Sequence, residues 1–278
     1  QAAVDVLARG EEVDVVRLAR GIAAANARAI LGISAPDDEL INPILSASAD
    51  SVAAQLRAMS PFRASPTDQP RSPEQVRAVL RLMTPERPGL LADLAAAGVP
   101  PAEVAAAGVA FATAAVATTI ASIPRAVALL ADLGLWPQAA VDPQAAAGEM
   151  LRVTAPTGVI PRVAAQDAFV STSAGSINVR AGDRLVLMTR AASRWSHPLP
   201  CLAQPVDASQ AMLVFGAGSH ACPGSRLARN QLAATIAALA PLAPQVSVAE
   251  VERTAALPHW RSLRIRASQP ALASRAAR

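Results

Sequence analysis

The chain has 278 residues, which is enough for one large domain or two. Its basic residues are all arginine, the formal net charge is only +4, and aromatic residues make up 3%, so stacking platforms for nucleic-acid bases are scarce. The 2 cysteines argue against a disulfide framework and fit a reducing cytoplasm.

Apolar spacing and the positions of Gly and Pro predict a mainly helical fold. Helices are expected over residues 13–31, 38–59 with a break at Pro43, 73–83 after a cap at Ser72, 85–97, 104–123, 124–133 and 143–153. Gly32 and Gly98 are expected to end the first and fourth helices. Segment 60–70, rich in Pro and Ser, is the clearest predicted loop.

Residues 104–123 carry no charge, and their number would suffice for a membrane span. The segment is mostly Ala, Thr and Gly, with few large apolar residues, so a buried central helix is the favoured interpretation. No targeting segment is evident at the start of the chain. We expect no membrane association.

A small sheet is predicted in the second half of the chain. Residues 168–171 and 176–179 read as short strands joined by a turn at Gly175, and a further strand covers 185–188. The fold class expected from the whole pattern is mainly α with a small β-sheet.

Residues 215–224 form a glycine-rich loop that ends in a cysteine and precedes a helix expected over 225–234. Two glycines allow a tight turn beneath a flat ligand. Cys222 comes directly before Pro223, near the expected helix N-terminus, where the macrodipole favours a thiolate. Such a thiolate suits a haem iron. The alternative is a glycine-rich turn with a buried, inert cysteine.

This loop resembles the cysteine-ligand loop of the cytochrome P-450 family. The matching positions are Phe215, Gly216, Gly218, His220, Cys222 and Gly224. The resemblance implies haem b (iron protoporphyrin IX) with Cys222 as its metal ligand and the other five residues around it.

Glu149 and Arg152 are three residues apart and therefore share one helix face. The segment resembles the Glu-x-x-Arg helix of the same family, which implies a structural pair. The family usually adds an arginine from the meander before the cysteine loop, but residues 198–210 contain none. The resemblance also implies that Arg162 and His220 contact the haem propionates. Without the family context, Arg162 is equally a surface arginine.

Residues 114–119 resemble the oxygen-activating helix of the family, Ala-Gly-x-(Asp/Glu)-Thr-Thr, and place Thr118 on its distal threonine. Here Ala115 replaces the glycine and Ala117 replaces the acid, which removes a proton-relaying carboxyl. Alternatively, Thr118 and Thr119 bond backward to main-chain carbonyls of their own helix.

Zinc is a second reading of the cysteine region. Four side chains would have to supply the ligands: His197, Cys201, His220 and Cys222. His-x-Cys is an unusual zinc half-site, and this reading leaves the glycines and the Glu-x-x-Arg segment unexplained.

The resemblance implies one haem-binding domain over residues 1–278, corresponding to the later part of a cytochrome P-450-like fold and lacking its N-terminal portion. The implied activity is that of a soluble bacterial, cytoplasmic monooxygenase of secondary metabolism. It would oxidise a small organic substrate with O₂ and electrons from a ferredoxin or flavoprotein. The alternative is a catalytically impaired relative that serves as a binding or recruiting module.

Overall fold

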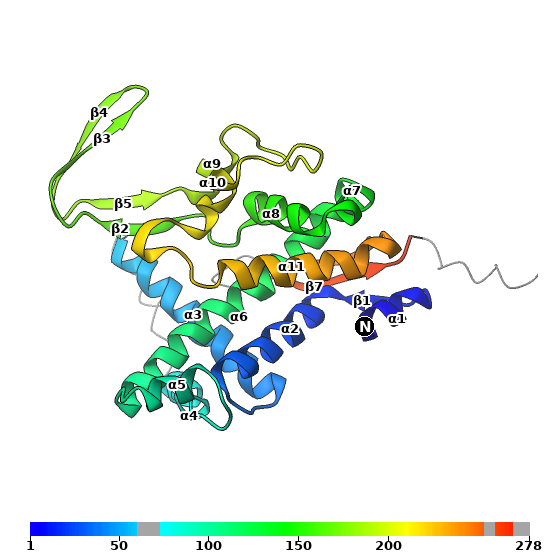
Figure 1. Ribbon diagram of the computed structural model, residues 1–278, viewed down its shortest axis with the longest axis horizontal. Helices are drawn as coiled ribbons and strands as arrows, with labels where there is room; N and C mark the ends of the chain where they lie inside the picture. Colours follow the sequence, from blue (N-terminus) through cyan, green and yellow to red (C-terminus); the bar gives the residue numbers. More distant parts are fainter. Residues whose placement is uncertain (60–72, 253–258, 269–278) are drawn as a thin grey trace, which may run out of the picture.

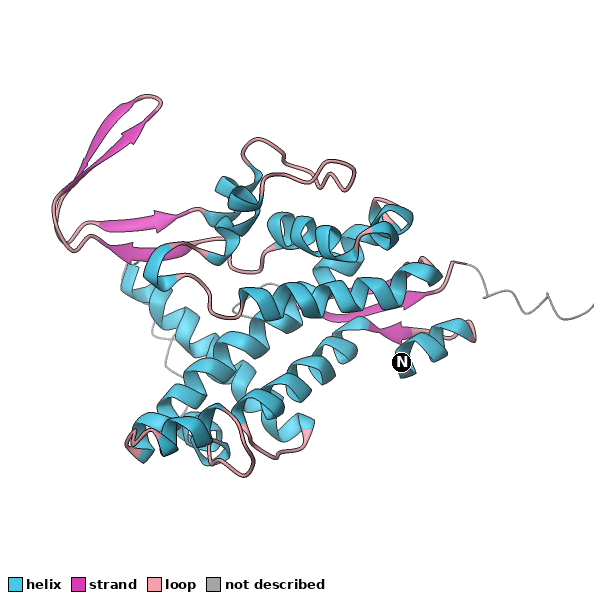
Figure 2. Cartoon of the chain, in the orientation of Figure 1, coloured by secondary structure: helices cyan, strands magenta, loops and turns pink. Residues whose placement is uncertain are grey.

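The computed structural model describes residues 1–59, 73–252 and 259–268. Within them, helices dominate and the strands form three small sheets (Figures 1 and 2). This confirms the predicted fold class. The loop predicted over 60–70 and the cap at Ser72 lie outside the described residues.

The helices are α1 (Ala2–Ala8), α2 (Val15–Leu31), α3 (Asp37–Met59), α4 (Pro73–Leu82), α5 (Leu90–Ala96), α6 (Pro101–Asp132), α7 (Trp136–Val141), α8 (Pro143–Thr154), α9 (Thr189–Arg194), α10 (Ala208–Met212) and α11 (Ser225–Leu239). Short 3₁₀ turns are η1 (Leu213–Phe215), η2 (Gly218–His220) and η3 (Ala240–Leu242).

The strands pair antiparallel. Strand β7 (His259–Arg266) lies between β1 (Val13–Asp14) and β6 (Gln245–Glu252), while β2 (Ile160–Val163) pairs with β5 (Arg184–Leu187) and β3 (Ala168–Thr172) with β4 (Gly175–Val179). The β3–β4 hairpin projects away from the helices (Figure 1). The strands β3, β4 and β5 were predicted; β1, β2, β6 and β7 were not.

Helix α6 is the central element and packs against α2, α3, α8 and α11. It is long and apolar enough to cross a membrane by length and composition alone, and many of its residues are buried against these neighbours. The predicted division at Pro124 is wrong, because the helix runs through it. A proline inside a helix costs about 3 kcal/mol, and packing of the nearby Ile123 and Ala126, 2% and 0% exposed, offsets that cost.

The expected break at Pro43 is also wrong, since α3 continues from Asp37 to Met59. Acidic side chains in its first turn favour the helix N-terminus, and Leu40, Ile41 and Ile44 are fully buried on either side of the proline. Tertiary packing holds the helix where local preference opposes it.

Helix α2 ends at Gly32, as predicted, with a left-handed φ of 73°. A Cβ at Gly32 would lie 2.4 Å from the carbonyl oxygen of Arg87. The main-chain N–H groups of Glu86 and Arg87 donate to the Gly32 carbonyl at 2.8 and 2.9 Å. These bonds engage the 86–87 turn, and Pro88 disfavours a helical conformation at Arg87, so the helix predicted over 85–97 begins only at Leu90.

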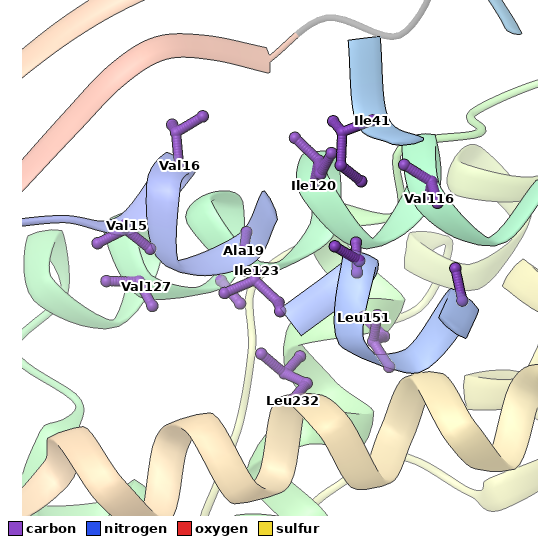
Figure 3. Packing of buried hydrophobic residues seen from close by; sticks show 14 of the residues in the cluster. Val15, Val16, Ala19, Ile41, Val116, Ile120, Ile123, Val127, Leu151 and Leu232 are labelled. Carbon is purple, nitrogen blue, oxygen red and sulfur yellow. The ribbon is translucent and has the colours of Figure 1, made fainter. Parts of the chain in front are cut away.

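The hydrophobic core cluster joins α2, α3, α6, α8 and α11 (Figure 3). Its members seen there are Val15, Val16, Ala19, Ile41, Val116, Ile120, Ile123, Val127, Leu151 and Leu232. Because Ile123, Leu151 and Leu232 come from three different helices, this core fixes how α6, α8 and α11 sit around the site described next.

Candidate functional site

The cysteine loop is a compact turn between η1 and α11. Gly216 and Gly218 both have φ of 73°, a conformation that side chains disfavour. The Cys222 N–H donates to the Phe215 carbonyl at 2.8 Å and closes the loop. Cys222 is exposed, so the expectation of a buried cysteine in the alternative reading is wrong. Pro223 lies in a turn, and α11 begins at Ser225.

A cavity of about 330 Å³ lies between this loop and α6. Its lining is mostly apolar and comes from α6, the α8–β2 connection, the cysteine loop and the first half of α11. Thr118 of α6 and Cys222 both line it, as do Phe215, His220 and Gly224. The structure therefore brings a hydroxyl and a thiol, 104 positions apart by their numbers, to the same cavity.

The α6 wall presents hydroxyl groups. Thr118 Oγ1 donates to the Ala114 carbonyl at 2.7 Å, as the alternative interpretation of this residue expected. Ser122 Oγ donates to the Thr118 carbonyl at 2.7 Å, and Thr119 Oγ1 donates to Gln231 Oε1 at 3.4 Å.

Ser122 and Gln231 also line the cavity, and sequence analysis missed both. Ser122 is four residues after Thr118 and shares its helix face, a signal that could have revealed it. Nothing local marks Gln231. Ala117 is 7% exposed and is not among the cavity-lining residues of the described chain.

Glu149 and Arg152 form a buried ion pair, with side chains 1% and 0% exposed. Arg152 Nε and Nη2 donate to the two carboxylate oxygens at 2.9 and 2.7 Å. The remaining guanidinium donors bind the carbonyls of Ser193, His197 and Leu199. The pair therefore anchors the chain that leads from α9 toward the cysteine loop.

Main-chain groups supply donors to Glu149 where the family usually has an arginine. The N–H groups of Cys201 and Val206 donate to its carboxylate at 3.0 and 3.3 Å. Burial by itself raises the pKa of Glu149, but the hydrogen bonds from Arg152 and Cys201 and the charge of Arg152 hold that pKa below its ordinary value. The carboxylate is thus stable without a third side chain.

The two expected propionate partners are placed differently. His220 is exposed in η2 and lines the cavity. Arg162 is exposed on β2, and its Nη1 donates to the Pro161 carbonyl at 2.8 Å; it does not line the described cavity. Their roles stay predictions. The zinc alternative has no geometric support, since no three metal-binding side chains gather in the described part of the chain.

No protein-family model and no curated protein matches this sequence. Solved structures do match. CYP164A2 of Mycobacterium smegmatis with econazole bound is 26% identical, with a TM-score of 0.73, over 95% of this chain and 71% of that one. This chain has a cytochrome P-450-like fold.

Other cytochrome P-450 structures agree. The mycinamicin VIII methyl hydroxylase MycCI of Micromonospora griseorubida matches with a TM-score of 0.72 at 18% identity, over 95% of this chain and 71% of that one. The haem domain of Acinetobacter radioresistens CYP116B5 matches with a TM-score of 0.71 at 20% identity, over 95% of this chain and 68% of that one. The resemblance expected from the cysteine loop is confirmed at the level of the cytochrome P-450 fold.

Proposed function

We propose that residues 1–278 form a single haem-binding domain of a monooxygenase that oxidises a small organic substrate. The observation that carries the proposal is the cavity between α6 and the cysteine loop, with Thr118 and Cys222 in its lining. A mostly apolar cavity with an exposed thiol suits a large apolar macrocycle whose iron takes a thiolate ligand.

Haem, when bound, supplies the activation of O₂. The Cys222 thiolate would ligate the iron, and the turn made by Gly216, Gly218 and Gly224 would hold it in place. Phe215, packed against the hydrophobic core, would shield the sulfur from water. Glu149 and Arg152 would keep the segment before the loop fixed.

Thr118 would act at the distal side of the cavity. Its Oγ1 already donates to the Ala114 carbonyl, so in this arrangement it accepts a hydrogen bond from a water or a substrate hydroxyl. Donation to a ligand requires the hydroxyl to rotate away from Ala114. With alanine at position 117, the proton must come from water or from the substrate itself.

The partners of such an enzyme are a small-molecule substrate and an electron donor, a ferredoxin or flavoprotein. The structural relatives include one solved with mycinamicin VIII and one solved in complex with a ligated acyl carrier protein. Those ligands are theirs. For this chain we propose a bacterial, cytoplasmic enzyme of secondary metabolism without a membrane or nucleic-acid partner.

The haem site is tested by the spectrum of the reduced, carbon-monoxide-bound protein after haem is added. A red-shifted Soret band shows thiolate ligation. Cys222→Ser should abolish the band, and Cys201→Ser should keep it, because Cys201 contacts Glu149 through its main-chain N–H. Loss of the band only in the Cys201 variant would overturn the assignment.

A second candidate is a binding or recruiting module that does little chemistry. The absent acid at position 117 and the Thr118 hydroxyl bonded within its own helix favour it. Both candidates bind haem, so the spectrum does not separate them. Product formed per O₂ consumed does, since a module would yield peroxide or nothing.

A further inference from the structure

One wall of the cavity is the connection between α8 and β2. Ala155, Pro156 and Thr157 line the cavity, yet this stretch belongs to no helix or strand. Its main-chain carbonyls have no regular partners and need donors from elsewhere. The groups that donate hydrogen bonds to these carbonyls therefore fix the position of this wall of the cavity.

Every carbonyl from residue 154 to residue 158 accepts a hydrogen bond from another element. Arg125 of α6 donates through Nη1 to Thr154 and Ala155 at 3.1 and 3.2 Å. The Thr189 hydroxyl donates to Thr157 at 3.0 Å.

Arg190 of α9 supplies the remaining bonds. Its Nε and Nη2 donate to the Ala155 carbonyl at 3.1 and 2.5 Å, and Nη2 also reaches Pro156 at 3.4 Å. Its main-chain N–H donates to Gly158 at 3.3 Å. A Cβ at Gly158 would lie 3.4 Å from the guanidinium, so the wall also packs on this side chain.

Burial and a neighbouring positive charge disfavour the charged form of Arg190, and its hydrogen bonds to the wall must offset this free-energy cost. Burial lowers its pKa, and the positive charge of Arg194 adds to the effect. Arg125 behaves alike: burial first, then the charge of Arg190, lowers its pKa to about 10. Two arginines converge on the Ala155 carbonyl although their charges repel. The planar guanidinium of arginine has several N–H donors in fixed directions and can bind neighbouring carbonyls together, whereas the ammonium of lysine cannot reproduce this geometry.

We propose that Arg190 is a positioning residue that holds the 154–158 wall and thereby sets which ligands fit beside it. The inference rests on the proposed haem site, because the position of the wall is measured by the affinity of ligands bound there. Arg190 does not line the described cavity, so it acts through the main chain of the wall.

The test compares two probes that both ligate haem iron, imidazole and the bulkier 4-phenylimidazole, by spectral titration. Arg190→Leu should weaken 4-phenylimidazole about tenfold and imidazole less than about twofold, because only the phenyl group needs an ordered wall. Arg194→Leu is the matched control on the same helix; its Nε donates to Pro198 and not to the wall. Arg190→Lys should recover less than half of the change in the logarithm of the 4-phenylimidazole dissociation constant that Arg190→Leu causes. An unchanged ratio of the two dissociation constants in Arg190→Leu, or an equal change in Arg194→Leu, overturns the inference.

Failure of the proposed function would look different. If the wild-type chain takes up no haem, neither probe gives a spectral change, and the haem proposal fails. The role of Arg190 is then decided on the haem-free chain by hydrogen exchange of a peptide covering residues 154–163. Faster exchange in Arg190→Leu than in Arg194→Leu supports it, and equal exchange contradicts it. Should Arg190→Leu not fold, Arg190→Lys against Arg194→Lys gives the same comparison.

Discussion

The Glu149 carboxylate accepts the main-chain N–H of Cys201 at 3.0 Å across 52 positions of the sequence. The bond joins α8 to the segment before the cysteine loop. With the Val206 N–H, it supplies donors where the sequence lacks the arginine usual in this family. Because the partner is main chain, no particular side chain at position 201 is needed.

Removal of Arg152 should be severely destabilising. Arg152→Leu leaves Glu149 buried without its counter-charge, which costs about 3–5 kcal/mol. Soluble yield and haem retention should both fall sharply. Arg9→Leu, which breaks the exposed pair with Glu11, is the control and should change the free energy of unfolding by less than about 1 kcal/mol. Normal yield and haem content of Arg152→Leu would show that the pair is dispensable.

The acid stability of the protein should depend on Glu149. Its pKa in the folded chain is below the ordinary value of 4.5, so folding favours the carboxylate. The resulting stabilisation is complete above the ordinary pKa and is lost as pH falls through the lower, folded value. The difference in unfolding free energy between the wild type and Glu149→Gln should therefore shrink between about pH 6 and about pH 3. Urea titrations at several pH values measure it; a constant difference would refute this role.

Two glycines of α2, Gly21 in the helix interior and Gly32 at its C-cap, should respond oppositely to alanine. Gly32→Ala would place a Cβ 2.4 Å from the Arg87 carbonyl oxygen and strain a left-handed backbone conformation. The free energy of unfolding should therefore fall by more than about 1 kcal/mol. A Cβ at Gly21 would have no atom within 4 Å, so Gly21→Ala should raise the free energy of unfolding by about 0.5–1 kcal/mol. Thermal unfolding of both variants provides the check. Equal effects would mean that the α2 C-terminus does not contact the 86–87 turn.

An acid at position 117 should improve coupling. A positioned proton donor typically contributes about 10²–10⁴-fold, and Ala117 precedes Thr118 on the helix. With an apolar substrate, Ala117→Asp should raise the product formed per O₂ consumed and lower peroxide release, while Ala117→Asn should not. Ala117 is 7% exposed, and burial raises the pKa of a new carboxyl, so folding is measured in parallel. Tight coupling in the wild type with that substrate, unchanged in Ala117→Asp, would contradict the prediction.

Local chemistry made several features predictable from the sequence. Asp142 accepts the N–H groups of Gln144 and Ala145 and starts α8, as its place before Pro143 indicated. Gly32 ends α2 for the same kind of reason. The glycines and Cys222 of the cysteine loop act within ten residues of one another, so their spacing alone indicated the loop and the family resemblance.

Other features were decided only by tertiary contacts. Pro124 is a helix breaker by local preference, yet α6 passes through it because burial on both sides outweighs the lost hydrogen bond. The donors to Glu149 are main-chain groups of Cys201 and Val206, which leave no trace in residue identity. Arg190 looks like any other arginine of this chain until the fold brings it to the Ala155 carbonyl. Sequence patterns report short-range geometry and side-chain type, whereas free energy from packing and from main-chain donors depends on which distant segments meet.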